Sequence, residues 1–329
     1  MKKEKSCGAV VYKTENGKLL FLVERMRLGH TSIPKGHVEE NETEAETALR
    51  EIREETNLEV NLDTHFSHTI SYSPRAGVVK DVIFFVAEAK EGEIINQESE
   101  VSALEWLPYQ EAVSAMTYED DRETLKKARK YLKVVDRAVR FAVRKHAGTN
   151  RKGTGLPYIV HPMEAAAIMA GLTGDREMIA AAVLHDTLED TDTTKEVLER
   201  KFGKRVAELV LAESEDKMRG FPPDATWKER KQATIERLKN ASNGERTLAL
   251  ADKLSNIRAM ERDLDEAGDE LWDRFNQKDP KEHGWYYGSL ADVFCSDDAL
   301  RDTQACREYV RRVREVFGPG CCREPEKGR

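Results

Sequence analysis

Three glutamates stand at a spacing that places them on one side of a helix. Glu51, Glu54 and Glu55 follow one another at i, i+3 and i+4, and residues so spaced are neighbours on a helix surface. Like charges this close repel one another unless a cation lies among them, and carboxylate oxygens suit Mg²⁺ or Mn²⁺. The alternative is a solvated acidic face, the usual meaning of a glutamate-rich run. The surrounding residues favour the metal site.

The stretch from Gly36 to Leu58 predicts the helix that carries these glutamates. It reads GHVEENETEAETALREIREETNL, with Asn41 and Thr43 as cap candidates and no Gly or Pro from Val38 onward, which is typical of a helix. An apolar stripe for docking on a core is formed by Ala45, Ala48, Leu49 and Ile52.

This stretch resembles the Nudix box, the signature of a pyrophosphohydrolase family, through Gly36, Glu42, Arg50-Glu51-Ile52 and Glu54-Glu55. Asn57 stands where the family has Gly, and we expect the turn to survive because Asn tolerates the left-handed conformation that ends a helix. The resemblance implies Mg²⁺ bound by the three glutamates, with Glu54 helping to activate the attacking water. Arg50 would pair with Glu42 and hold the loop.

The flanking residues narrow the resemblance to the branch that cleaves diadenosine tetraphosphate. They are Pro34 to Glu39 ahead of the box, and Leu107 to Ala112 and Met116 to Glu119 behind it. Substrate contacts are then assigned to Lys35 and Arg50, with His37, Tyr72, Lys80 and Tyr118 as further candidates and Glu100 as an extra ligand or base. Simple exposure, or packing for Tyr118, is the alternative.

A second candidate site lies where two apolar helices end in acidic residues. Residues 177–188 are apolar almost all round, which predicts a buried helix, yet they contain His185 and Asp186; Leu248 to Asp252 repeats the pattern. A buried charge needs a partner or a metal. A lone histidine in such a helix is more often a hydrogen-bonded core residue, so the argument depends on the whole set.

With His161, these residues resemble the ligand set of an HD-type metal site, in the hydrolase domain of Rel/Spo alarmone enzymes and small alarmone hydrolases. The match runs from about 137 to 290 through Arg151-Lys152, Pro157 to Pro162, Leu184 to Thr191 and Leu250 to Arg258. It implies removal of the 3′-pyrophosphate of (p)ppGpp with one Mn²⁺, held by His161, His185, Asp186 and Asp252. Glu189 and Asp190 would orient the water and handle protons.

The same resemblance assigns substrate contacts in this half of the chain. For the basic residues among them a surface salt bridge is the alternative, and for Arg274 it is packing. The residues are Arg151, Lys152, Lys217, Arg230, Lys231, Asn256 and Arg274. The loop between Lys152 and Pro157 departs from the usual pattern, so the identity of the base is less determined than the chemistry.

The fold expected is an α/β (α+β) sandwich over residues 1–130, an all-α HD domain over 131–318 and a disordered tail over 319–329. Strands are predicted at 7–12, 18–24, 78–89 and 104–107, with Asn16-Gly17 as a hairpin turn. Helices are predicted at 112–116, 121–132, 162–172 and 177–188. The boundary near 130 falls within or between helices, without a Gly/Ser linker.

Composition narrows the function classes. The formal charge of −8 argues against nucleic-acid binding, and no apolar run or N-terminal segment reads as a membrane span or signal. Five cysteines without zinc spacing indicate reduced thiols and a cytoplasmic protein. Nucleotides are the expected partners. Whether the protein forms a homo-oligomer is not determined by the sequence.

These features together predict a bifunctional nucleotide pyrophosphohydrolase. One half would cut a dinucleoside polyphosphate with Mg²⁺, and the other would degrade (p)ppGpp with Mn²⁺. No synthetase segment follows the hydrolase before residue 329, so we expect degradation and not synthesis. Two alternatives stand: the second half is a non-catalytic (p)ppGpp sensor that regulates the first, or it hydrolyses another nucleotide.

Overall fold

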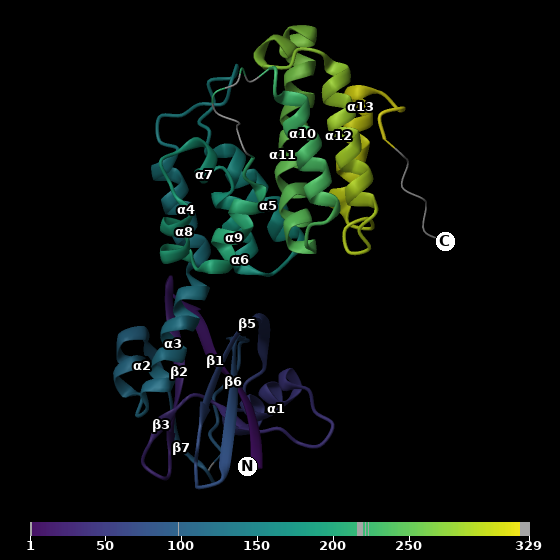
Figure 1. Cartoon of the computed structure of the whole chain (residues 1–329). Helices are drawn as coiled ribbons and strands as arrows, with labels where there is room; N and C mark the ends of the chain where they lie inside the picture. Colours follow the sequence, from purple (N-terminus) through teal and green to yellow (C-terminus); the bar gives the residue numbers. More distant parts are fainter. Residues whose placement is uncertain (1, 98, 216–219, 221, 223, 323–329) are drawn as a thin grey trace. The chain divides into compact units, whose positions relative to one another are not determined.

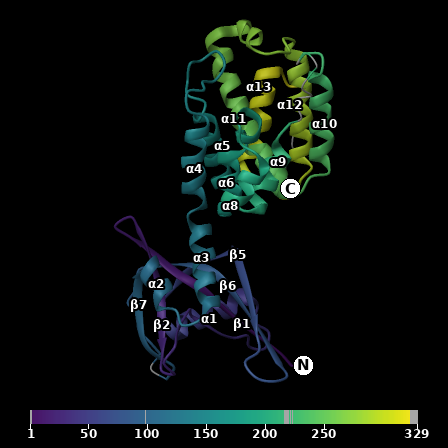
Figure 2. The same ribbon diagram turned by 60° about the vertical axis from the view of Figure 1, so that its left-hand side comes forward.

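The computed structural model describes residues 2–97, 99–215, 220, 222 and 224–322. It divides into two units, Met1–Lys133 and Val134–Arg329, which Figures 1 and 2 show from two directions. The last helix of the first unit ends at Leu132 and the first helix of the second begins at Val134. In the part of the chain that is described, no helix is both long and apolar enough to cross a membrane.

The first unit is built on one mixed sheet. Its strands are β1 (Lys2–Glu15), β2 (Lys18–Met26), β3 (Thr31–Ser32), β4 (Lys35–His37), β5 (Val60–Tyr72), β6 (Val78–Ala89) and β7 (Val101–Pro108). The order is β3-β2-β1-β6-β5, with β4 paired to β1 and β7 to β2. The pairing of β1 with β6 is parallel, and the other pairings are antiparallel.

Helices cover both faces of this sheet. The helix α1 (Glu44–Thr56) packs on one face through Ala48 and Ile52, while α2 (Tyr109–Ala115) and α3 (Glu119–Leu132) pack on the other; Figure 1 shows them on opposite sides. Phe84 and Phe85 enter these two separate cores, as their alternation along a strand predicts. The predicted mixed α and β sandwich is confirmed.

The two turns predicted from asparagine are also present. Asn16 and Gly17 connect β1 to β2 with φ of 50° and 74°, the left-handed pair of a tight hairpin. Asn57 ends α1 with φ 60° and ψ 12°, and Thr43 forms a capping box with Glu46 at the other end. Leu49 was expected in the buried stripe of α1, but its side chain is 40% exposed.

The second unit is helical. Its elements are α4 (Val134–Lys145), α5 (Val160–Leu172), α6 (Arg176–Leu184), α7 (Thr187–Asp190), α8 (Lys195–Phe202), α9 (Lys204–Glu213), α10 (Trp227–Lys239), α11 (Asn243–Ala267), the 3₁₀ helix η1 (Gly268–Arg274), α12 (Pro280–Cys295) and α13 (Gln304–Phe317). The long α11 packs against α5, α6, α9 and α13. Figure 2 shows α13 next to it, followed by α12 and then α10.

Both helices whose bounds were predicted in the second unit differ from those bounds. The helix α5 begins at Val160, so His161 lies in its first turn, where Pro162 costs no hydrogen bond. The predicted helix 177–188 is broken after Leu184 because side chains take its carbonyl groups. His185 Nδ1 lies 2.8 Å from the Ala182 oxygen, and Thr187 Oγ1 donates to Leu184 at 2.7 Å.

Two further segments were not anticipated. The strand β5 escaped prediction because its apolar alternation is interrupted where its pairing with β6 shifts register, between Asp63 and His68. In the segment predicted as a tail, Cys321 and Cys322 are partly buried against the helical core, and residues 323–329 lie outside the described part. All five cysteines are free thiols.

Candidate functional site

The four side chains predicted as metal ligands in the second unit meet in one cluster. The Nε2 atoms of His161 and His185 are 3.2 Å apart. His161 Nε2 lies 3.0 Å from Asp252 Oδ1, and His185 Nε2 lies 2.9 Å from Asp186 Oδ2. These residues come from α5, α11 and the break between α6 and α7, so packing of these elements assembles the cluster.

Both histidine rings are oriented by hydrogen bonds on their far side. His161 Nδ1 lies 2.8 Å from Ser255 Oγ, which donates its own proton to Glu164 at 2.9 Å. His185 Nδ1 lies 2.8 Å from the carbonyl oxygen of Ala182. Each Nδ1 is therefore the donor, and each Nε2 presents its lone pair to the cluster. This is the tautomer that a metal ion requires.

The two carboxylates are held as firmly. Tyr158 donates its hydroxyl to Asp186 Oδ2 at 2.7 Å, and Asn256 donates to Asp252 Oδ1 at 2.7 Å. Burial opposes the charge of Asp252, but the neighbouring Lys253 and His185 bring its pKa well below the ordinary value. The cluster thus offers two imidazole nitrogens and two charged carboxylates, a donor set that fits a divalent ion.

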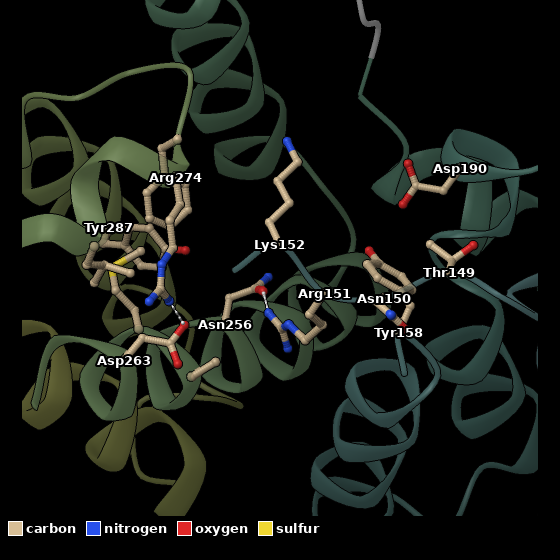
Figure 3. Close-up of a pocket in the computed structure, with 14 residues that line it drawn as sticks. Thr149, Asn150, Arg151, Lys152, Tyr158, Asp190, Asn256, Asp263, Arg274 and Tyr287 are labelled. Atoms are coloured by element: carbon tan, nitrogen blue, oxygen red, sulfur yellow. Dashed lines mark hydrogen bonds and ion pairs between the residues drawn. The ribbon is translucent and has the colours of Figure 1, made fainter. Parts of the chain in front are cut away.

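Figure 3 shows the residues that line a cavity of about 470 Å³. It lies beside the cluster, because its lining residues Tyr158 and Asn256 donate hydrogen bonds to Asp186 and Asp252. Its polar lining includes Thr149, Asn150, Arg151, Lys152, Tyr158, Asp190, Asn256, Asp263, Arg274 and Tyr287. The guanidinium of Arg151 donates to Asn256 at 3.1 Å, and that of Arg274 pairs with Asp263 at 3.3 Å. The cavity is linked to the cluster by Tyr158 and Asn256, which bond Asp186 and Asp252. It is linked to α7 by Asp190.

Arg274 lies far from Arg151 in the sequence, yet its side chain contacts the loop that follows Arg151 and Lys152. A methyl group on Gly153 would lie 2.4 Å from Arg274 Cδ, and Gly153 has φ of +80°. The side chain of Arg274 therefore lies against the loop that follows Lys152, in a space that only glycine leaves open. This loop is the one whose sequence departs from the Rel/Spo pattern.

Other residues predicted to act beside this cavity lie elsewhere. Arg230 and Lys231 pair with Glu215 at 3.1 and 2.8 Å and do not line the cavity. Glu189 accepts a hydrogen bond from the Glu215 amide at 2.6 Å, whereas its neighbour Asp190 faces the cavity. Lys217 lies outside the described residues.

In the first unit, Arg50 gathers the carboxylates of the predicted Mg²⁺ site. It donates to Glu42 at 2.7 and 3.0 Å, as predicted, and also to Glu51 at 2.8 Å and Glu54 at 3.1 Å. Its remaining hydrogen bond, of 2.9 Å, reaches the carbonyl oxygen of His37. The side chain of Glu54 is 51% exposed, so solvent reaches it.

Gly36 provides the space for Glu51. A methyl group at this glycine would lie 2.0 Å from the Glu51 carboxyl carbon, closer than any real contact. The first glycine of the box therefore permits β4 to approach α1 and lets the Glu51 carboxylate lie against bare backbone.

Glu55 is buried, unlike the half-exposed Glu54 of the same helix. It is 4% exposed, and its Oε2 accepts a hydrogen bond from the Lys35 amide at 3.0 Å. Burial raises the pKa of Glu55 to about 7. Its other neighbour is Glu24 of β2, which is 0% exposed and whose pKa is raised well above its ordinary value by burial and by Glu55.

The remaining candidates of the first unit differ in their contacts and in their exposure to solvent. Lys35 Nζ donates to Ser32 Oγ at 2.7 Å, and Lys80 Nζ lies 3.4 Å from His37 Nε2. Tyr72 and Tyr118 are 39% and 55% exposed, which leaves both rings accessible. Glu100 is exposed, and its charge helps raise the pKa of Glu51, for which burial is the larger cause.

Two family models match the chain, a NUDIX domain at residues 2–128 and an HD domain at 138–279. The human guanosine-3′,5′-bis(diphosphate) 3′-pyrophosphohydrolase MESH1 is 43% identical over 129 residues, which cover 38% of this chain and 68% of that protein. The second unit belongs to this pyrophosphohydrolase family. The first is a NUDIX domain.

Two further relatives show how far the likeness extends. The Aquifex aeolicus enzyme of the same name is 49% identical over 92 residues, 28% of this chain, and the match spans only 13% of that protein. Among solved structures, a Caenorhabditis elegans Ap4A hydrolase complex matches 39% of this chain and 97% of its own, with 26% identity and a TM-score of 0.37.

Sequence reasoning missed several residues of both domains. In the HD domain these are Tyr158 and Ser255, which form hydrogen bonds with Asp186 and His161, two of the predicted ligands. In the NUDIX domain the missed residue is Glu24. A signal was present for Glu24, since it is a charged residue at the end of the apolar run Lys18 to Glu24. Nothing local to Ser255 indicates its partner.

Proposed function

We propose that the HD domain removes the 3′-pyrophosphate of (p)ppGpp. The observation that carries this proposal is the cluster of His161, His185, Asp186 and Asp252 beside a cavity with cationic walls. A cation held by two imidazoles and two carboxylates suits hydrolysis of a phosphate ester. Arg151, Lys152 and Arg274 supply the charge that a nucleotide pyrophosphate needs. The name of the human relative supports the same substrate.

Each group of the HD domain then has a task. The four ligands would hold Mn²⁺, which supplies a polarised phosphate and a water of lowered pKa when bound. Asp190 lines the cavity and, with Glu189 beside it on α7, would orient the attacking water and take its proton. Arg151 and Asn256, joined at 3.1 Å, would contact phosphate and ribose, and Arg274 the departing pyrophosphate.

For the NUDIX domain we propose cleavage of a phosphoanhydride in a dinucleoside polyphosphate. Glu51, Glu54 and Glu55 would hold Mg²⁺, and the half-exposed Glu54 would take the proton of the attacking water. Arg50 fixes Glu51 and Glu54 by hydrogen bonds of 2.8 and 3.1 Å. Lys35 lies at the site, because its backbone N–H donates a hydrogen bond to the Glu55 carboxylate. The accessible rings of Tyr72 and Tyr118 are available for stacking on bases.

The two proposed activities are both hydrolyses at phosphorus. The NUDIX domain would cut a phosphoanhydride, and the HD domain would cut the ester bond that joins the 3′-pyrophosphate to ribose. Bifunctionality, the choice of Mg²⁺ and Mn²⁺ and a cytoplasmic site of action remain part of the proposal.

The test resolves products of ppGpp by anion exchange after incubation of the full chain with Mn²⁺. We expect GDP and pyrophosphate from the wild type and from Glu54→Ala, and none from Asp186→Ala. The control Asp192→Ala changes an exposed aspartate of the same unit and should retain activity. Binding of ppGpp without turnover would replace catalysis with a sensor, and absence of both would overturn the substrate.

The NUDIX activity is tested on diadenosine tetraphosphate with Mg²⁺. We expect ATP and AMP from the wild type and from Asp186→Ala, and a loss of at least ~10²-fold in Glu54→Ala, because activation of the water is worth about that much. Glu111→Ala, an exposed glutamate of α2, is the matched control. Equal rates in Glu54→Ala and the wild type would contradict the assignment.

A further inference from the structure

Glu24 is a charged residue placed inside the sheet of the NUDIX domain. It lies on β2 between Ser32 of β3 and Leu104 of β7 in the sheet register, and it is 0% exposed. A buried carboxylate is costly unless it is paired or binds a cation. Both its position in an inner strand and its type therefore require a compensating group.

No described residue provides that group as a hydrogen-bond donor. Neither carboxyl oxygen of Glu24 has a hydrogen-bond partner among the described residues. The nearest cation is Lys35, but its ammonium donates to Ser32 Oγ at 2.7 Å. That hydrogen bond goes to Ser32 and not to Glu24, so neither Glu24 oxygen receives a donor from Lys35.

The carboxyl group of Glu24 instead faces another carboxyl group. Glu55 is the neighbour that interacts most strongly with Glu24, and Glu51 also contributes repulsion. Both glutamates belong to the box on α1, and Glu55 is itself buried, 4% exposed. Three acidic side chains from β2 and α1 therefore converge. Among the described residues, Arg50 pairs with Glu51 at 2.8 Å, whereas Lys35 is the cation nearest to Glu24 and Glu55 and its ammonium bonds Ser32. Within the described part of the chain, the buried pair of Glu24 and Glu55 therefore lacks a cation bonded to both carboxyl groups.

We propose that Glu24 is a fourth carboxylate of the NUDIX metal site, which binds the divalent ion together with the glutamates of the box. This inference rests on the proposed function, in which that box holds such an ion. Glu24 would anchor the ion to the sheet, whereas Glu51, Glu54 and Glu55 anchor it to α1. The unpartnered oxygens are then ligand atoms, and the ion supplies the missing charge.

The competing explanation is a proton shared between Glu24 and Glu55. It would make the pair a purely structural element, and a glutamine at position 24 would reproduce it, since its amide donates a hydrogen bond to Glu55 without carrying charge. Glu24→Gln therefore separates the two explanations: it preserves the pair and removes a ligand.

The experiment measures Mn²⁺ affinity by electron paramagnetic resonance of the full chain. All proteins carry Asp186→Ala, so that the ion that is bound belongs to the NUDIX domain. We expect Glu24→Gln to weaken Mn²⁺ binding by about 10- to 100-fold. Glu24→Asp, which keeps the charge, should recover part of the affinity, and the exposed Glu111→Gln should match the parent.

Two further measurements keep the outcomes distinct. Circular dichroism in EDTA verifies that each variant is folded, and Glu54→Gln reports on the box itself. Unchanged affinity in Glu24→Gln, with weaker binding in Glu54→Gln, would overturn the role of Glu24 and leave the NUDIX proposal intact. Unchanged affinity in both variants would overturn the proposed box site, and Glu24 with it.

Discussion

Arg50 and Glu42 form a two-pronged ion pair at the start of the NUDIX box helix. The guanidinium Nε donates to Glu42 Oε1 at 2.7 Å, and a terminal nitrogen donates to Oε2 at 3.0 Å. The same arginine also holds Glu51 and Glu54. One side chain therefore connects the loop before α1 to the carboxylates that are proposed to bind the metal.

This pair predicts a pH dependence of stability. The hydrogen bonds from Arg50 lower the pKa of Glu42 from 4.5 to about 2. Because the folded-state pKa lies below the unfolded one, the contribution to stability is complete above about pH 4.5 and is lost as the pH falls toward 2. Above pH 4.5 we expect the amides of α1 to exchange hydrogen faster in Glu42→Gln than in the wild type. Below that pH the exchange rates of the two proteins should converge.

Hydrogen exchange of peptides from α1, corrected for intrinsic rates, measures this effect within the first unit. The matched control is Glu111→Gln, which changes an exposed glutamate of the same unit. A difference between wild type and Glu42→Gln that does not depend on pH would contradict the role of the ion pair.

Gly36→Ala should displace Glu51. The added methyl group would lie 2.0 Å from the Glu51 carboxyl carbon, so the carboxylate or the strand β4 has to move. A displacement of about 1 Å at a reacting group can cost ~10²-fold in rate, and we expect that loss on the NUDIX substrate.

Gly92→Ala is its control, because the nearest atom to that methyl group would be Leu58 Cδ2 at 3.8 Å. Steady-state rates and circular dichroism of both variants check the prediction. A fully active Gly36→Ala enzyme would show that Glu51 need not occupy its observed place.

Ser255→Ala should weaken metal binding in the HD domain without unfolding it. Ser255 Oγ accepts a hydrogen bond from His161 Nδ1 at 2.8 Å and donates one to Glu164 at 2.9 Å. These bonds fix the His161 tautomer whose Nε2 lone pair faces the cluster. Loss of such a supporting group typically costs 10- to 100-fold in metal affinity. Metal content after dialysis against graded Mn²⁺ concentrations measures it.

Ser289→Ala offers a matched comparison, since that hydroxyl bonds only the Trp285 carbonyl oxygen of its own helix at 2.8 Å. We expect it to bind metal as the wild type does. Equal metal content in the two variants would mean that Ser255 does not position His161.

Replacement of Asn57 by alanine should destabilise the first unit, whereas replacement by glycine should not. The φ of 60° at Asn57 is left-handed, a conformation that costs most residues roughly 1–2 kcal/mol and asparagine less. We expect Asn57→Ala to lower the free energy of unfolding of the first unit by about 1 kcal/mol, and Asn57→Gly to leave it unchanged or slightly higher. Urea denaturation of both variants tests this, and equal stability of the two would contradict it.

Local chemistry made much of the architecture predictable from sequence. The capping box of Thr43, the hairpin at Asn16-Gly17 and the left-handed Asn57 each involve residues within a few positions of one another, so their patterns are visible in a short window. Helix α6 was mistaken only at its end, where the side chains of His185 and Thr187 bond the carbonyl oxygens that would have continued the helix.

The sequence by itself determined which residue types could do chemistry: glutamates at helical spacing in the box, and histidines and aspartates at the ends of apolar segments. Only the tertiary structure decided which of them meet and what supports them. Glu24 faces Glu55 because β2 lies inside the sheet, and Ser255 reaches His161 because α11 packs on α5. Such contacts join residues far apart in the chain, and no local pattern encodes them.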